Sequence, residues 1–177
     1  MTISLYDLFN QFCESTSDRM KWKESRMTRT RFVMAFFREY MSRNGLNEPY
    51  KDYMLVDAVW RDPRSGYIEV ALEHENKGDA EKFVKEEIDH LADLKSVNKV
   101  AITYPPIGEE KRTLEAIGNV IQKRFFVTSQ MPGENYLIIF GFATSQLKKR
   151  AIRWNGHFFS SEGKLRDSRE KVVFQKS

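Results

Sequence analysis

The sequence predicts a mixed α/β (α+β) fold in which a mixed β-sheet is flanked by helices, and three observations lead to that class. Apolar residues recur at helical spacing in some segments and alternate or run together in others. Turn and capping signals separate these segments into the order α-α-β-β-α-β-α-β-β. Hydrophobic residues make up 41% of the 177 residues, which is enough for a core. Because no linker-like composition interrupts the chain, we expect one domain over residues 1–177.

Two helices are expected before the first strand. Ser4 is a candidate N-cap for the first helix, whose apolar residues follow at i, i+3, i+4 and i+7: Leu5, Leu8, Phe9 and Phe12. The second helix is expected over about Thr28–Arg43, with Asn44-Gly45 as its stop signal. The polar and basic stretch Ser15–Met27 between them is expected to be a connector.

A β-hairpin is expected next. Tyr53–Trp60 and Tyr67–Glu75 are strand-like, because both are rich in β-branched, aromatic and aliphatic residues. Between them, Arg61–Gly66 contains the Asp-Pro and Ser-Gly signals of a hairpin loop. The segment before the hairpin, Asn47–Asp52, is a poor candidate for a further strand.

The C-terminal half is expected to alternate helices and strands. The expected elements are a helix near Asp79–Lys95 capped by Asp79, a strand at Lys99–Tyr104, a helix near Glu109–Phe126, a strand at Tyr136–Ala143 and a last strand at Lys149–Phe159. Tyr136–Ala143 is apolar on both faces, so it should lie inside the sheet. The polar tail from Ser160 is expected to be loose.

Composition and charge narrow the class of protein. The longest apolar runs are a few residues, far below the about 20 that span a membrane, and the N-terminus lacks a signal-peptide pattern. The lone Cys13 cannot form an internal disulfide. We therefore expect an intracellular, cytoplasmic protein with no membrane partner. Common NTPase, dinucleotide-binding and serine-hydrolase motifs are missing from the sequence, and its three histidines make no zinc pattern.

The candidate site is a set of carboxylates on the two strands of the hairpin. Glu73 and Glu75 share one strand face because strand side chains alternate, whereas His74 points to the other face. If the turn centres near Ser65, Asp57 lies opposite Glu73 on the same face, and a slip of one residue would break the site. Hard oxygen donors without thiolates favour Mg²⁺ or Mn²⁺. The alternative is a solvated sheet face whose acids pair with nearby bases.

The segment LVDAVW, a short loop and YIEVALEHENK together resemble the core signature of the restriction-endonuclease-like nucleases, the PD-(D/E)XK superfamily. In that superfamily an Asp on one strand precedes a Glu-x-Lys on the next, and a helix and another strand follow. The resemblance covers about Thr28–Tyr104 and implies a restriction-endonuclease-like mixed sheet flanked by helices. Residues 105–159 would then be a C-terminal elaboration, and residues 160–177 a polar tail.

The resemblance also assigns roles to individual residues. Asp57 would be the first acid and Glu73 the second, with Glu75 in place of the lysine, and all three would hold the metal ion. A shifted alternative takes Glu75-Asn76-Lys77 as the Glu-x-Lys element and Glu73 as an extra acid. In either case Lys77 would assist near the scissile phosphate. Superfamily members often place a Glu on the preceding helix, so Glu39 is a further candidate ligand.

The sequence departs from the superfamily pattern at two places. Val56 stands where a proline usually precedes the Asp, and the lysine is either replaced or displaced by two positions. These departures leave open whether catalysis survives.

The predicted function is that of a metal-dependent nuclease, an Mg²⁺- or Mn²⁺-dependent endonuclease that hydrolyses DNA phosphodiester bonds. Basic and aromatic residues mix near the last expected strand, so four residues there are candidates for DNA contacts: Lys148, Lys149, Arg150 and Arg153. A homodimer would suit the cutting of both strands of a duplex. Two alternatives stay open: a catalytically inactive nucleic-acid-binding module on the same fold, and a structural or regulatory partner protein.

Overall fold

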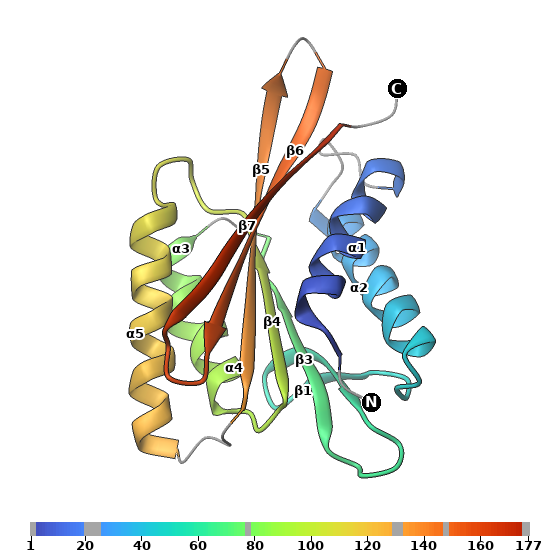
Figure 1. The fold of residues 1–177 in the computed structure, drawn as a ribbon, viewed down its shortest axis with the longest axis vertical. Coiled ribbons are helices and arrows are strands. Elements are labelled where there is room, and N and C mark those ends of the chain that lie inside the picture. The colour runs from blue at the N-terminus through green and yellow to red at the C-terminus, as the bar shows by residue number, and fades with distance from the viewer. Residues whose placement is uncertain (1–2, 20–25, 77–78, 129–132, 147–148, 175–177) are drawn as a thin grey trace.

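The computed structural model describes residues 3–19, 26–76, 79–128, 133–146 and 149–174 of the chain. Within this part, seven strands form one mixed sheet in the order β1-β2-β3-β4-β5-β6-β7 (Figure 1). The strands are β1 Tyr50–Tyr53, β2 Val56–Arg61, β3 Ile68–His74, β4 Asn98–Thr103, β5 Asn135–Gln146, β6 Lys149–Ser160 and β7 Leu165–Phe174. The helices are α1 Leu5–Arg19, α2 Arg26–Arg43, α3 Ala80–Lys82, the π-helix η1 Phe83–Ile88, α4 Asp89–Asp93 and α5 Glu110–Thr128. The expected mixed α/β class is confirmed.

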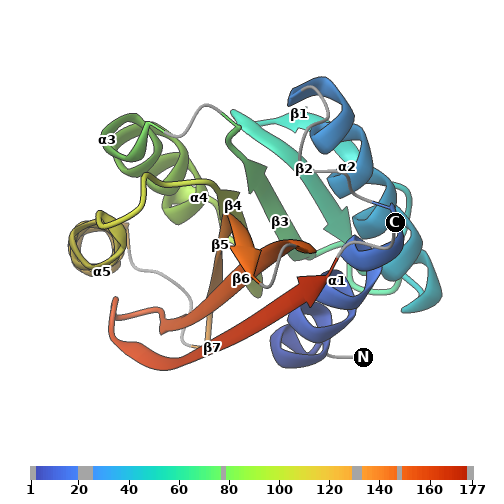
Figure 2. The same cartoon turned by 90° about the horizontal axis from the view of Figure 1, so that it is seen from above.

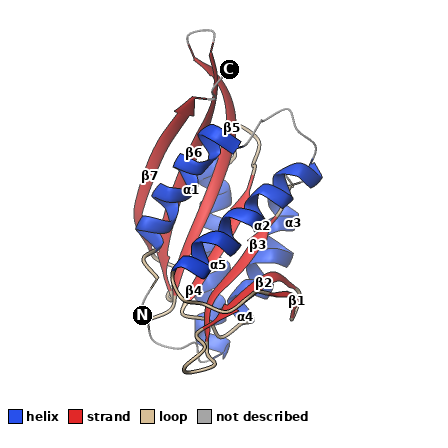
Figure 3. Ribbon diagram, turned by 90° about the vertical axis from the view of Figure 1, so that its right-hand side faces the viewer, coloured by secondary structure: helices blue, strands red, loops and turns tan. Residues whose placement is uncertain are grey.

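Helices cover both faces of the sheet. Helices α1 and α2 lie on one face, and α3, η1, α4 and α5 lie on the other (Figure 2). Figure 3 shows α1 and α2 crossing the front of the strands. Each face has its own core, and the α1/α2 side is rich in aromatic residues: Phe9, Phe12, Phe36, Phe37, Tyr40, Trp60 and Trp154. No helix in the described residues is long and apolar enough to cross a membrane.

Helix α1 is longer than the sequence predicts. Ser4 Oγ accepts a hydrogen bond from the Asp7 backbone N–H at 3.3 Å, so the predicted N-cap is confirmed. The helix continues to Arg19, however, and the connector predicted from Ser15 is wrong over residues 15–19. The reason is a distant contact: Thr16 is fully buried and its hydroxyl accepts a hydrogen bond from Trp154 Nε1 at 3.0 Å.

The hairpin of β2 and β3 has the predicted register. Ala58 pairs with Leu72 and Val59 with Ala71, which places Asp57 opposite Glu73. The strands are antiparallel, and the loop between them contains Gly66 at φ 73°. The prediction of the hairpin and of its pairing is therefore confirmed.

The predicted strand Tyr53–Trp60 is divided by a two-residue turn. Met54 and Leu55 have φ angles of 49° and 71°, and the chain before them folds back as β1, antiparallel to β2. The rejection of a strand at 47–52 was therefore wrong in part, since β1 begins at Tyr50. Turns with positive φ at both central residues normally carry Asn-Gly or similar residues, and no such signal is present here.

Replacing Met54-Leu55 by Asn-Gly is expected to stabilise the protein by about 1–2 kcal/mol, because left-handed φ angles cost bulky residues roughly 1 kcal/mol each. The two side chains are 67% and 72% exposed, so little packing is lost. Urea unfolding of the double variant and of Met54→Ala, which leaves both φ angles unchanged, would measure the effect. A double variant no more stable than Met54→Ala would contradict the expected relief of strain.

The rest of the sheet follows the predicted order and adds one strand. Strands β3, β4 and β5 are parallel, so their carboxyl ends lie at the same edge, and β5 lies between β4 and β6 as expected for an apolar strand. The tail from Ser160, predicted to be loose, instead forms β7 against β6. Its charged side chains suit an edge strand, where polar residues discourage further pairing, and Val173 is its buried contact with the core.

Candidate metal centre

The hairpin brings Asp57 and Glu73 into direct contact on the face covered by α3, η1 and α4. Asp57 Oδ2 accepts a hydrogen bond from the His74 backbone N–H at 2.8 Å, which fixes the carboxylate. After burial, the charge of Asp57 is the next cause that raises the pKa of Glu73. Repulsion between two neighbouring carboxylates favours a proton on one of them when no cation is bound.

Two further acids lie beside this pair. Glu75 follows the last residue of β3, and its charge raises the pKa of Asp57. Glu87 comes from η1, and burial raises its pKa, with additional contributions from the charges of Glu75 and Asp57. The predicted grouping of Asp57, Glu73 and Glu75 on one side of the sheet is thus what the structure has, with Glu87 added.

A histidine completes the group. One ligand atom each from Glu73, Glu87 and His90 can be chosen so that all three lie within 4.8 Å of one another. Glu87 and His90 stand three residues apart on a helical segment, which is the spacing that places two side chains on one face. This spacing is the one signal in the sequence that points to them, and the sequence prediction missed both residues.

Two buried atoms in the group have no hydrogen-bond partner among the described residues. They are Glu73 Oε1, in a side chain that is 2% exposed, and His90 Nδ1. Buried polar atoms are nearly always paired, so an orphaned carboxylate oxygen in an acidic cluster fits a site for a cation. The residues present therefore suit a divalent ion.

The electrostatics agree with that fit. Burial, followed by the charges of Asp57 and Glu87, raises the pKa of Glu73 to about 10. Burial also raises the pKa of Asp57, against the opposing effect of its hydrogen bond from His74. When neighbouring acids raise one another's pKa values, a cation bound among them offsets the repulsion between their charges.

His74 lies on the opposite face, as the strand alternation predicts. Its Nε2 is 3.1 Å from the Tyr104 hydroxyl, and the side chain is 8% exposed. Burial and then the charge of Arg29 lower its pKa to about 3, so the ring is neutral at physiological pH. It is part of the α1/α2 side of the molecule and does not face the carboxylates.

Glu39 and Lys77 do not add to the described cluster. Glu39 is exposed on α2, and α2 packs on the other face of the sheet, so this side chain is separated from Glu73 by the sheet itself (Figure 2). The suggested role of Glu39 as a metal ligand has no geometric basis. Lys77 lies outside the described residues.

The basic residues near β6 are placed only in part. Lys148 lies outside the described residues, and Lys149 and Arg150 are the first residues of β6. The Arg153 guanidinium lies 4.6 Å from the centroid of the Phe142 ring and 3.8 Å from the Glu170 carboxylate. Arg153 is therefore engaged by its own chain.

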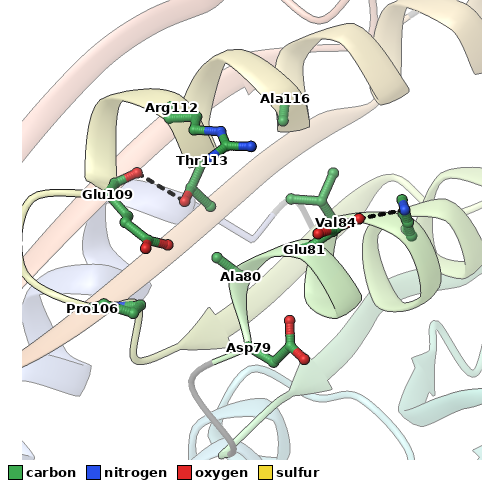
Figure 4. Close-up of a pocket in the computed structure, with 10 residues that line it drawn as sticks. Asp79, Ala80, Glu81, Val84, Pro106, Glu109, Arg112, Thr113 and Ala116 are labelled. Carbon is green, nitrogen blue, oxygen red and sulfur yellow. Dashed lines mark hydrogen bonds and ion pairs between the residues drawn. The ribbon is translucent and has the colours of Figure 1, made fainter.

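A separate pocket of about 450 Å³ lies between the start of the α3–η1 segment and the first turns of α5. Figure 4 shows its lining, which includes Glu81 of α3 and Arg112 of α5. The pocket shares no residue with the carboxylate group. The hollow in Figure 4 is thus distinct from the candidate metal centre.

Comparisons with protein-family models, with curated proteins and with solved structures found no match for this chain. Function is therefore inferred from the residues and their geometry.

Proposed function

We propose that the protein is a metal-dependent nuclease that hydrolyses DNA phosphodiester bonds, with Asp57, Glu73 and Glu75 as ligands of Mg²⁺ or Mn²⁺. One observation carries the proposal: two carboxyl groups are paired across β2 and β3, with Asp57 half-buried and Glu73 buried, and Glu73 Oε1 has no partner in the described residues. A hard divalent cation would bind that oxygen and offset the repulsion among the acids.

The order of elements gives the proposal further support. Asp57 lies on β2 and Glu73 on the antiparallel neighbour β3, and the helical segment α3–η1–α4 and the parallel strand β4 follow. This is the order that the resemblance to restriction-endonuclease-like nucleases implies. The absence of the proline and the altered lysine position are departures that an activity measurement must address.

The chain's own residues would do the following. A divalent cation, when bound, polarises the phosphodiester, lowers the pKa of the attacking water and offsets charge on the leaving oxygen. Asp57 is held in one orientation by the His74 N–H and so presents a fixed oxygen to the ion. Glu73 is immobilised by burial, and Glu75, half-buried at the end of β3, lies where the site meets solvent.

DNA is the partner in this proposal, and a net charge of +4 suits a polyanionic substrate. A homodimer remains part of the proposal for duplex substrates, since two copies of one site can cut the two strands.

The test is cleavage of labelled duplex, single-stranded and branched DNA in Mg²⁺, in Mn²⁺ and in EDTA. Wild-type protein is expected to cut at least one substrate only when metal is present. Asp57→Asn should lower the rate by about a hundredfold or more, since removing one ligand weakens both the affinity for the ion and its position. Glu39→Gln is the matched control: an acid on the opposite face of the sheet, whose loss should leave cleavage unchanged.

Two outcomes would overturn the proposal. Binding of intact DNA, unaffected by metal, would favour the inactive nucleic-acid-binding module. If the protein neither binds nor cuts DNA and metal does not raise its melting temperature, the result would favour a structural or regulatory protein. Circular dichroism of each variant would show that a loss of cutting is not a loss of folding.

A further inference from the structure

We propose that Glu73, Glu87 and His90 form a second cation site, which takes Mn²⁺ or another transition-metal ion in preference to Mg²⁺. The site extends the carboxylate group from β3 onto η1 and α4, and it adds a nitrogen ligand. Its binding of metal does not depend on the proposed nuclease activity, so the two can be tested separately.

The spacing of the three ligand atoms suits a single ion. All of them lie within 4.8 Å of one another, and ligands bound at about 2.0–2.2 Å from one ion are separated by at most about 4.4 Å. Glu87 and His90 are only half-buried, so small rotations of these two side chains can close the difference. Glu73 is the fixed member, because its side chain is 2% exposed within the core of the sheet.

Two unpartnered atoms support a ligand at this place, independently of the number of acids. Glu73 Oε1 and His90 Nδ1 are both buried and without hydrogen-bond partners among the described residues. They belong to two of the three residues of the site and come from different elements, β3 and α4. A cation bound by these residues would take a carboxylate oxygen and an imidazole nitrogen as ligands, the two kinds of atom that are left unpaired.

The backbone near these residues is unusual. Glu87 lies in the π-helix η1, and His90 follows in the first turn of α4. A π-helical turn inside an otherwise α-helical segment is rare and is frequently found at functional sites. The π-helix η1 packs through Phe83 and Ile88 on the core of the sheet face that α3, α4 and α5 also cover. The charges of Glu75 and Asp57 raise the pKa of Glu87, so Glu87 lies near the carboxylates of the hairpin.

The donor set decides which ion is favoured. Mg²⁺ prefers oxygen ligands throughout, whereas the affinity of a site with an imidazole nitrogen rises from Mn²⁺ through Co²⁺ to Ni²⁺, and imidazole is also a common ligand of Zn²⁺. Asp57 and Glu75 offer only oxygen, and the Glu73 carboxyl contacts both Asp57 and the new group. Glu73 would therefore be shared between an all-oxygen site and a mixed nitrogen and oxygen site.

Electron paramagnetic resonance of Mn²⁺ tests this site without any activity measurement. The full-length protein is stripped with EDTA, desalted and titrated with Mn²⁺, and electron spin-echo envelope modulation then detects nitrogen bound to the ion. Wild-type protein is expected to show ¹⁴N modulation. His90→Gln should abolish the modulation, and Glu87→Gln should weaken binding at this site by about tenfold or more. Glu86→Gln is the matched control, since Glu86 is exposed in the same turn and pairs with Lys82.

The outcomes separate the two proposals. Wild-type protein without ¹⁴N modulation, or modulation that persists in His90→Gln, would overturn the second site, whatever the result of the cleavage test. Modulation that is lost in His90→Gln and retained in Asp57→Asn would establish it, even if no DNA is cut. Mg²⁺-dependent cutting by a folded His90→Gln protein that also keeps the ¹⁴N modulation would overturn the second site and leave the proposed nuclease intact.

Discussion

Glu73→Gln is expected to stabilise the metal-free protein by about 3 kcal/mol near pH 7 and at the same time to remove its metal-dependent activity. The stabilisation follows from the pKa of Glu73, which burial and the charges of Asp57 and Glu87 raise to about 10. The folded protein must therefore take up a proton that the unfolded chain does not hold at this pH. Glutamine is neutral and nearly the same shape, so it avoids that requirement and loses only the ability to bind a cation.

The sign of the pH dependence is fixed by the same pKa. Below the ordinary pKa of about 4.5, Glu73 is protonated in both states and contributes no penalty. Between that value and about 10, the folded state binds more protons than the unfolded state, so the free energy of unfolding of the metal-free protein falls as pH rises. The advantage of Glu73→Gln should therefore be small near about pH 4.5 and grow toward about pH 9.

Urea unfolding in EDTA across that pH range measures this difference. Glu69→Gln is the control, because Glu69 is also a buried acid of β3 but accepts hydrogen bonds from the Ile3 backbone N–H at 3.3 Å and from Asn98 Nδ2 at 3.4 Å. Because Glu69→Gln disturbs these hydrogen bonds, it should not stabilise the protein. A Glu73→Gln protein less stable than wild type in EDTA would contradict the electrostatic account of the cluster.

Lys99→Met is expected to destabilise the protein by about 3–5 kcal/mol, because it leaves an unpaired charge in the core. Lys99 Nζ lies 2.6 Å from Glu134 Oε2, and the two side chains are 0% and 1% exposed. The ammonium also donates to the Tyr136 hydroxyl at 3.1 Å and to the Ala92 carbonyl at 3.3 Å. Removing the Lys99 ammonium leaves the Glu134 carboxylate buried without its cation.

Two further variants separate a stranded charge from lost packing. The double variant Lys99→Met, Glu134→Leu removes both charges and should regain most of the stability. Lys85→Met breaks the ion pair between Lys85 and Glu81, whose side chains are 70% and 73% exposed, and should leave the stability nearly unchanged. Thermal and urea unfolding would measure all three, and a double variant as unstable as Lys99→Met would contradict the explanation.

The part of the site that the sequence predicts is the part that depends on local pairing. Strand alternation and one assumed turn centre place Asp57 opposite Glu73, and the structure has that register because the hairpin loop is short and carries clear turn residues. The same local logic places His74 on the other face. Glu87 and His90 could not be predicted in this way, since their approach to Glu73 depends on how the π-helix packs against the sheet.

The elements that the sequence did not predict depend on contacts between distant residues or on unusual backbone conformations. The end of α1 is held by the contact of Thr16 with Trp154, and β7 depends on its pairing with β6. No local pattern contains either contact. The turn at Met54 and Leu55 escaped prediction for a different reason: its residues are ones that rarely adopt positive φ angles.

The central claim is that Asp57 and Glu73 act through a bound divalent cation, and reversible cleavage tests it most directly. Labelled DNA is incubated with wild-type protein in Mg²⁺, then after removal of the ion with EDTA, and again after Mg²⁺ is restored. We expect cutting to stop and then to return, with Asp57→Asn slower than wild type by about a hundredfold or more whenever Mg²⁺ is present and Glu39→Gln indistinguishable from wild type. Cutting that continues in EDTA, or that a folded Asp57→Asn protein retains, would contradict the account.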